Sequence, residues 1–519
     1  MSADMSTGTS PKSGMATSVI ATQRATYLKH LLTQASAAAD ESGLGLKHLR
    51  EKAIAQVNAR SFPAGRDEEW RFTDLSDMLK LPFERAHAEQ AAKINESISE
   101  SASTPLDLTS VDLASAGSTQ SGLTQSGLTQ SGLTQSGLAQ IEDSYRLTTI
   151  NGHYVSALSI ESRSDHAPVR SDGSDGSDGS DGSDDSAQSE GVVIAPLSQL
   201  ISDAAYGPQI SQIVTDKLAQ VQGSGEVFTA LNTAGFSDVM VIWLKADQKV
   251  EQPIHIVRTS VGESISHLRT LVIAEPHSSC TLVESFIGNS ADHLQPRCNN
   301  SVTEIVLAEG AQINHIRLQD EGLQTFHIAK TAVSQAANSR YSCTAIDLGG
   351  QLSRHHLEVY QAGPQTDTHL YGLSALQGKQ LADTHSLLAL TYPHSTATQV
   401  QKNVVDDRAH AVFNGKVYVS QAAQFTDAAQ LNRNLMLSSK ARIDTKPELD
   451  IVADNVKCAH GATVSQLQAD EVFYLQSRGI SAEQAQRLLL YGFAMEIVEK
   501  ISVEPLRQVL GDRITHWAN

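Results

Sequence analysis

A cysteine and a histidine stand two positions apart near the C-terminal end of the chain, as Cys458 and His460 in the stretch DNVKCAHGATVSQ. Side chains two residues apart on a β-strand point to the same face, so a strand here would present the thiol and the imidazole together. Both groups are ligands that zinc and iron accept. Two ligands do not close a metal site, so the missing ligands would come from elsewhere in the chain or from a partner subunit.

The spacing alone leaves a second interpretation open. Free cysteine is among the most buried residue types, and Cys458 could be a structural cysteine beside a hydrogen-bonded histidine. The other three cysteines, Cys280, Cys298 and Cys343, are scattered without a CxxC pair. This pattern argues against a disulfide framework and against a four-cysteine zinc or cluster site within this chain.

The remaining histidines show no spacing that is typical of metal ligands. His355 and His356 are adjacent, so a strand would point them to opposite faces, and we do not expect them to bind one ion. The other histidines are spread evenly along the chain, and we expect most of them at turns or on surfaces.

Four aspartates raise an alternative class of function. β-Helix proteins include polysaccharide-degrading enzymes that use clustered carboxylates, and Asp347, Asp383, Asp427 and Asp444 could form such a cluster. No paired spacing supports this alternative, and aromatic residues, which sugar sites favour, make up only 5% of the chain. The sequence contains no GxSxG, HExxH or GxGxxG motif and no phosphate-binding P-loop, so we expect no nucleotide bound through a phosphate loop of this chain.

Charge and hydropathy argue against several classes of partner. The chain has 519 residues and a formal net charge of −19, which opposes binding to nucleic acid or to anionic membranes. The sequence has no apolar run of about 18 residues, and its start lacks the apolar core of a signal peptide. We therefore expect a cytoplasmic protein of two or three structural units.

Residues 226–460 repeat one plan of strand, short turn and strand, without long helices between the units. The turns are expected at Ala246-Asp247, Glu275-Pro276, Glu309-Gly310, Gly349-Gly350, Gly378-Lys379, Asp406-Asp407 and Ser438-Ser439. Parallel strands normally need a bulky crossover, which a solenoid avoids because each coil stacks on the previous one. The pattern predicts a mainly β protein with a parallel β-helix (solenoid) core, and a β-sandwich is the alternative.

We expect a disordered tail over 1–20 and an N-terminal helical domain over 21–225. A small hairpin is expected in that domain, at the turn signal Asn151-Gly152. Low-complexity repeats of TQSGL and SDG predict two disordered insertions, over 113–140 and 168–190.

Residues 461–519 are expected to form a C-terminal helical domain. Ser481 is a good N-cap for its main helix, with Gln484 in the capping-box position. Leu490, Phe493 and Ile497 recur at helical spacing, so we expect them to face inward.

The stretch 410–480 resembles the signature region of the SufB/SufD family, the scaffold proteins of the SUF system for iron–sulfur cluster assembly. The resemblance rests on the ordered motifs VFNGK, DTKPELDIVADNVKCAHGAT and FYLQSRGI. Upstream, FPAGRDEEWRFTDLS resembles SufD members of the family rather than SufB members. The resemblance covers most of the chain outside the tail and the insertions, and it implies the same order of helical, β-helical and helical domains.

The resemblance implies a non-catalytic scaffold subunit that pairs with a SufB-like scaffold through the β-helix. A SufC-like ABC-type ATPase would dock on the C-terminal helical domain, where we assign Phe473, Tyr474 and Arg478 to partner binding. Cys458 and His460 would form a half-site for iron or a transient iron–sulfur cluster, completed by a cysteine of the partner scaffold. The chain alone would hold no cofactor, because ATP would be bound by the ATPase only. An inert half-site, and a homodimer that forms without the SufB-like partner, remain open alternatives.

Overall fold

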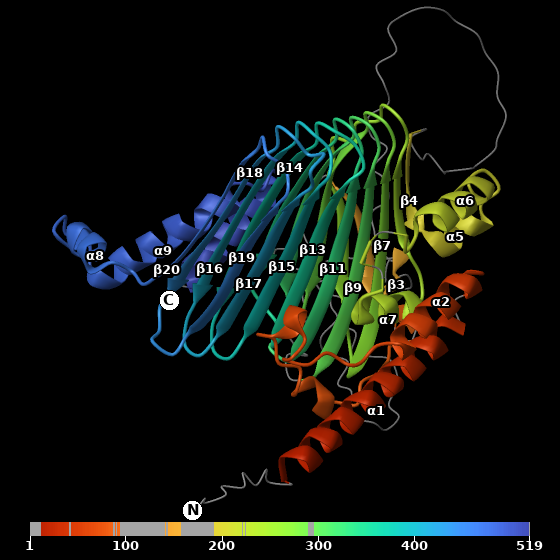
Figure 1. The fold of residues 1–519 in the computed structure, drawn as a ribbon, viewed down its shortest axis with the longest axis horizontal. Coiled ribbons are helices and arrows are strands. Elements are labelled where there is room, and N and C mark those ends of the chain that lie inside the picture. Colours follow the sequence, from red (N-terminus) through yellow and green to blue (C-terminus); the bar gives the residue numbers. More distant parts are fainter. Residues whose placement is uncertain are drawn as a thin grey trace, which may run out of the picture.

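The computed structural model describes residues 12–40, 43–86, 89, 91–93, 141, 144–156, 191–220, 222–223, 225–288 and 295–517. Within them the chain is mainly β, a parallel solenoid with helices before and after it (Figure 1). The expected insertions and the first part of the expected tail lie outside the described residues. The first helix, α1 (Lys12–Asp40), begins inside the stretch that we expected to be a tail.

Two ten-stranded sheets build the solenoid, and the strands of the coils alternate between them. Sheet A contains, in spatial order, β19 (Arg442–Ile451), β17 (His410–Val419), β15 (Leu381–Leu390), β13 (Leu352–Gln361), β11 (Thr325–Gln335), β9 (Arg297–Leu307), β7 (Ser264–Ala274), β5 (Met240–Leu244) and β4 (Val192–Pro196), with β1 (Glu84–Arg85) beside β7. Sheet B contains β20 (Lys457–Ser465), β18 (Asp427–Met436), β16 (Thr396–Val405), β14 (Asp367–Leu376), β12 (Arg340–Asp347), β10 (Gln312–Asp320), β8 (Ser279–Ile287), β6 (Ile254–Thr259), β2 (Tyr145–Ile150) and β3 (His153–Tyr154).

The predicted parallel β-helix is therefore confirmed. Successive strands of each sheet pair in parallel and in register, so equivalent side chains of neighbouring coils stack into columns. One such column of sheet A holds Val333, Val359, Leu388 and Val417, all buried in the core between the two sheets. Every coil thus buries its inward apolar side chains on the next coil, which is how a solenoid is stabilised without crossover helices.

Each coil has two turns, one leading from sheet A to sheet B and one leading back, and the sequence predicted one turn per coil. All seven predicted turns lie between strands: the first three lead from sheet A to sheet B, and the other four lead from sheet B to sheet A. The missed turns include those in which Asn338, Gln365 and His394 adopt positive φ. Each of these residues donates its backbone N–H to the turn of the next coil, so the stacked turns support one another. Asparagine and histidine are among the non-glycine residues that adopt this conformation most often, so at least two of the missed turns did carry a sequence signal.

Helices cover the outer face of sheet A. They are α1, α2 (Lys47–Asn58), α5 (Leu197–Ser202), α6 (Gly207–Lys217) and α7 (Val227–Gly235), and they share apolar clusters with sheet A (Figure 1). Residues 62–83, which we call the N-terminal strap, lie over the same face and contain the short 3-10 helices η1 (Glu68–Trp70) and η2 (Met78–Lys80).

The predicted hairpin forms, but it belongs to the solenoid rather than to a separate helical domain. Strands β2 and β3 pair antiparallel around Asn151 and Gly152, whose φ angles of 54° and 85° suit a tight hairpin turn. Strand β2 also pairs in parallel with β6, which makes it part of sheet B. The solenoid therefore begins before residue 226.

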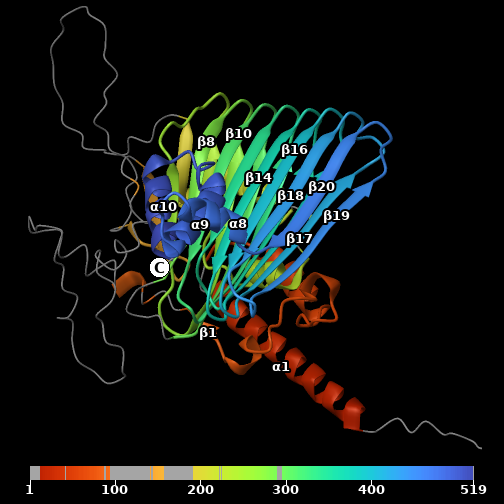
Figure 2. The ribbon, with the colours of Figure 1, turned by 90° about the vertical axis from the view of Figure 1, so that its left-hand side faces the viewer.

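The C-terminal helices are α8 (Ala469–Gln476), α9 (Ala482–Val498) and α10 (Glu504–Trp517). The capping box of Ser481 and Gln484 forms as predicted, and Leu490 and Ile497 are buried with Phe493 partly buried beside them. Helices α9 and α10 pack on the outer face of sheet B (Figure 2). The preceding strand β20 runs to Ser465, so the predicted boundary at 460 falls within a strand.

The two sheets are open at one end of the solenoid. Strands β19 and β20 end the two parallel stacks there and each pair with one neighbour only, whereas at the other end each sheet finishes in an antiparallel strand, β4 or β3. In the described part of the chain, no helix has both the length and the apolarity needed to cross a bilayer.

Candidate functional site

Cys458 and His460 lie on β20, the last strand of sheet B at the open end. They pair with Ala428 and Gln430 of β18, which are both buried in the interior, so the thiol and the imidazole share the inward face of the sheet. Cys458 is half-buried and packs against the main core, whereas His460 is exposed. The interpretation as a sealed structural pair does not fit this position, because the last coil has no further coil over it.

The hydrogen-bonding pattern shows which backbone groups of β20 face the open edge. Lys457 donates its N–H to the carbonyl of Thr426, 2.9 Å away on the neighbouring turn. Alternate residues of a parallel strand bond to the same neighbour, so the backbone groups of Cys458, His460 and Ala462 point away from β18. A strand added at this edge would lie directly beside the thiol and the imidazole.

The edge of sheet A differs in one residue. The N–H groups of Arg442 and Val452 bond to the neighbouring coil, so the odd-numbered residues of β19 face the open edge. Pro447 occupies one of these outward positions and has no N–H to offer. Proline at such a position is typical of a protected edge, which leaves β20 as the better edge for strand pairing.

The thiol of Cys458 is held in its protonated form. Burial raises the pKa of Cys458, and the negative charge of Asp427 also raises it. A hydrogen bond with the backbone of Ala428 lowers this pKa, but by less than burial raises it. A metal ion bound by this thiol would therefore have to displace its proton. The described residues contain no group of three or more His, Cys, Asp or Glu side chains that could hold a metal ion, so the pair offers two ligands at most.

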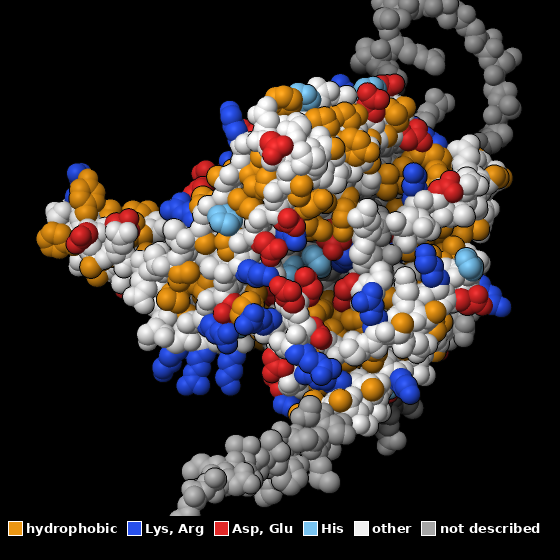
Figure 3. Space-filling model, viewed as in Figure 1, with side chains coloured by type: hydrophobic (Ala, Val, Ile, Leu, Met, Phe, Trp, Pro, Cys, Tyr) orange, Lys and Arg blue, Asp and Glu red, His pale blue; other side chains and the backbone are white. Residues whose placement is uncertain are grey.

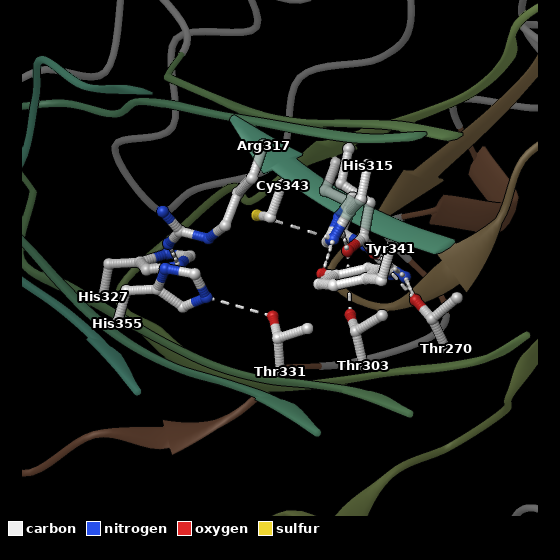
Figure 4. A network of polar contacts seen from close by, with 11 residues as sticks. Thr270, Thr303, His315, Arg317, His327, Thr331, Tyr341, Cys343 and His355 are labelled. Carbon is white, nitrogen blue, oxygen red and sulfur yellow. Dashed lines mark hydrogen bonds and ion pairs between the residues drawn. The ribbon is translucent and has the colours of Figure 1, made fainter. Parts of the chain in front are cut away.

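The interior of the solenoid holds a polar network that the sequence did not reveal (Figure 4). Glu284 lies 3.2 Å from the imidazole of His315, which also contacts Tyr341 and Cys343. Burial alone would raise the pKa of Glu284, but His315 and Arg258 lower it to about 2. Burial alone would lower the pKa of His315, but Cys343 and Glu284 raise it to about 9.

This network is structural, because its ionisable groups are sealed between the sheets. Our expectation that most histidines lie at turns or on surfaces is wrong for His255, His315 and His327, which are fully buried. His355 and His356 do point to opposite faces, as predicted. His355 contacts Thr331 in the interior, and His356 lies on the outer face of sheet A, 3.2 Å from Glu358.

The four aspartates considered for polysaccharide chemistry do not converge. Asp347 is paired with Arg317 inside the solenoid, and Asp383 is buried under the N-terminal strap. Asp427 lies at the start of β18 in sheet B, and Asp444 contacts His410 on sheet A. The described residues therefore provide no carboxylate groove formed by these four side chains, and the alternative function loses its site.

Helix α8 carries Phe473 and Tyr474, two of the residues that we assigned to partner binding, and the third, Arg478, lies two positions after its end. It has no buried residue and projects from the body of the protein with hydrophobic side chains on its surface (Figures 1 and 3). Phe473 and Tyr474 are 69% and 55% exposed, which is unusual for aromatic side chains. Arg478 stacks over the Tyr474 ring at 4.7 Å. Exposed aromatic and arginine side chains of this kind favour protein binding.

Fold and site together define a class of protein, a parallel β-solenoid with helical flanks whose last coil presents a thiol and an imidazole side by side at an open sheet edge. A family model described as SUF system FeS cluster assembly, SufBD core domain, matches residues 256–493. The SufD protein of Escherichia coli is 31% identical over 322 residues, which cover 60% of this chain and 75% of that protein. The chain belongs to the SufBD family.

Two further relatives agree with this assignment. An iron–sulfur cluster assembly SufBD family protein of Synechocystis is 48% identical over 298 residues, covering 56% of this chain and 66% of that protein. The chloroplastic protein ABCI7 of Arabidopsis thaliana is 36% identical over 307 residues, covering 57% of this chain and 64% of that protein. The alignments thus span slightly less than two thirds of these two relatives.

Proposed function

We propose that this chain is a non-catalytic scaffold subunit for iron–sulfur cluster assembly, in which Cys458 and His460 form half of a ligand site. The observation that carries the proposal is the position of this pair at the open edge of β20. Relatives named as iron–sulfur cluster assembly proteins support the role. The iron or cluster is cargo held during assembly, and the chain alone keeps no cofactor.

A SufB-like scaffold completes the site in this proposal. Its strand adds to β20, where three successive outward backbone positions, at Cys458, His460 and Ala462, are available for hydrogen bonds. A cysteine on that strand would lie beside the thiol and the imidazole. The proline in β19 supports β20 as the pairing edge, since it interrupts the competing edge.

The substitution His460→Ala tests the site. The side chain is exposed and on an edge strand, so we expect the fold and the complex with the SufB-like partner to persist. The amount of cluster assembled on the reconstituted complex, read from its visible absorbance, is expected to fall about tenfold or more because a direct ligand is lost. His48→Ala, an exposed histidine on α2, serves as the control. An unchanged cluster yield would mean that the half-site is inert.

The proposal assigns ATP binding to a SufC-like ATPase that docks on the C-terminal helices. Helix α8 is its docking element, because α9 and α10 already cover sheet B while α8 buries none of its side chains. The net charge of −19 favours neither nucleic acid nor an anionic membrane as a partner. A cytoplasmic location and a homodimer in the absence of the SufB-like scaffold stay predictions.

Replacing the exposed aromatic residue of α8 tests this docking. Phe473→Ser is expected to weaken binding of the ATPase about 30-fold, since an interface aromatic residue typically contributes about 2 kcal/mol. Ile20→Ser on α1 removes an apolar side chain of similar exposure, 51%, and is the matched control. Affinities are measured by titration calorimetry with the purified ATPase. Equal affinities for both variants and the unmodified chain would exclude Phe473 from the interface.

A further inference from the structure

A column of amide side chains leads through the interior of the solenoid to His460. Gln399 of β16, Gln430 of β18 and His460 of β20 occupy equivalent positions in successive strands of sheet B. Both glutamines are buried. The Nε2 group of Gln430 donates to Oε1 of Gln399 at 2.9 Å, and Gln399 in turn donates to Ser386 Oγ at 2.7 Å.

These hydrogen bonds fix the orientation of the last amide. Nε2 of Gln430 donates its hydrogen bond to Gln399 on the preceding strand, so Oε1 is the amide atom of Gln430 that is still free to accept one. This oxygen is buried and has no hydrogen-bond partner among the described residues. Buried polar atoms are almost always hydrogen-bonded, since an unsatisfied one costs free energy, so this carbonyl calls for a hydrogen-bond donor close by.

The opposite wall of the solenoid makes room for this amide. Gly415 of β17 faces Gln430 across the interior, where a Cβ atom would lie 2.4 Å from Gln430 Nε2 and 2.5 Å from Phe413 Cζ. Both distances are too short for a Cβ atom, so a side chain at position 415 would push the amide as well as the phenyl ring aside. The glycine of the VFNGK motif has a physical explanation in this close approach.

We propose that Gln430 is a positioning residue for His460. The two residues are direct cross-strand partners on the same face, and His460 has no hydrogen bond among the described residues. The Oε1 atom of Gln430 accepts the N–H of one imidazole nitrogen, which fixes the tautomer and turns the lone pair of the other nitrogen toward the open edge. A partner that orients a ligating histidine in this way raises its affinity for metal. The proposal rests on the proposed function in one respect only, namely that the second imidazole nitrogen of His460 binds iron or a cluster.

The tautomer of His460 in the isolated full-length chain tests the proposal directly. With ¹⁵N-labelled histidine, long-range ¹⁵N–¹H spectra report which ring nitrogen carries the proton, and the signal that His460→Gln removes identifies His460. We expect one dominant tautomer in the unmodified chain. Gln430→Met, which keeps the length of the side chain but removes the amide, is expected to return His460 to a mixture of tautomers.

Two further variants separate positioning from a general loss of structure. Gly415→Ala leaves Gln430 in the chain but displaces its amide, so we expect the same mixture of tautomers, and this variant replaces Gln430→Met if that one fails to fold. Gln401→Met is the control: it removes another buried glutamine of β16, two positions along from Gln399, which donates to Ser374 and Asn403 and not to Gln430. We expect it to leave the tautomer of His460 unchanged. The same tautomer ratio in Gln430→Met and in the unmodified chain would overturn the proposal.

The cluster yield of the reconstituted complex distinguishes this proposal from the proposed function. We expect Gln430→Met to lower the yield about tenfold, as loss of an orienting partner typically does. If the tautomer changes in Gln430→Met while His460→Ala leaves the yield intact, the positioning stands and the role of His460 as a ligand fails. If the tautomer does not change while His460→Ala lowers the yield, the ligand role stands and the positioning is overturned.

Discussion

Replacing Ala462 with proline is expected to weaken pairing with the proposed SufB-like scaffold strongly while the chain itself stays folded. The N–H of Ala462 points to the open edge and makes no bond within the solenoid, so proline removes nothing that holds β20 to β18. An added strand would lose one hydrogen bond and would meet the proline ring. A cost of about 3 kcal/mol corresponds to binding that is weaker by about 100-fold, measured by co-purification and titration of the two scaffolds.

The control for this prediction is Ala462→Ser, which adds a side-chain atom at the same position but keeps the N–H. It is expected to bind the partner normally. Thermal unfolding of both variants should match that of the unmodified chain within a few degrees. Normal pairing of the Ala462→Pro variant would show that the partner does not add a strand to β20.

Replacing Asp383 with alanine is expected to destabilise the chain by about 3–5 kcal/mol, because the change leaves a buried guanidinium without its counter-charge. The Asp383 carboxylate is fully buried and accepts hydrogen bonds from Arg354 and from Thr73 of the N-terminal strap. His385 lies 3.0 Å from its second oxygen, and Arg354 stacks over the strap residue Trp70 at 4.0 Å. The loss is measured as the shift in the midpoint of urea unfolding. Asp427→Ala, an exposed aspartate on β18, is the control and is expected to change stability by less than about 0.5 kcal/mol.

The difference between the Asp383→Ala variant and the unmodified chain is expected to depend on pH. Burial alone would raise the pKa of Asp383, but Arg354, His385 and Thr73 hold it well below its usual value of about 3.9. A carboxylate whose pKa is lowered by folding stabilises the fold above its unfolded pKa and loses that contribution as the pH falls. The difference should therefore be constant above about pH 5 and shrink below about pH 4. A difference that grows on acidification would contradict the ion pair.

The solenoid and its C-terminal cap were predictable because their signals are local. Turn residues recur once per coil, and the capping box of Ser481 with Gln484 lies within four positions of the sequence. The same local alternation predicted that Cys458 and His460 share a face and that the adjacent His355 and His356 do not. Each of these statements needs only the period of a strand or of a helix turn.

The rest of the site depends on contacts for which one sequence holds no periodic signal. Nothing in the sequence distinguishes Gly415 from other glycines, because its close approach to Gln430 depends on how the two sheets face each other. The register that sets Gln430 beside His460 becomes visible only when coils of unequal length are stacked, since the spacing between equivalent residues varies from coil to coil. The hairpin at Asn151-Gly152 was recognised from its turn, but its place in sheet B depends on a pairing with a distant strand, β6.

The N-terminal strap has a consequence for how this protein is made in the cell. Its residues are made before the strands that hold them, because Thr73 binds a carboxylate 310 positions later and Glu68 reaches Lys446, 378 positions later and 2.7 Å away. Trp70 packs on Phe228 and Arg354, so it is covered only when these later parts of the chain have been made. Products that end before β15 and β19 would lack Asp383 and Lys446, so the strap would lose both of these long-range contacts.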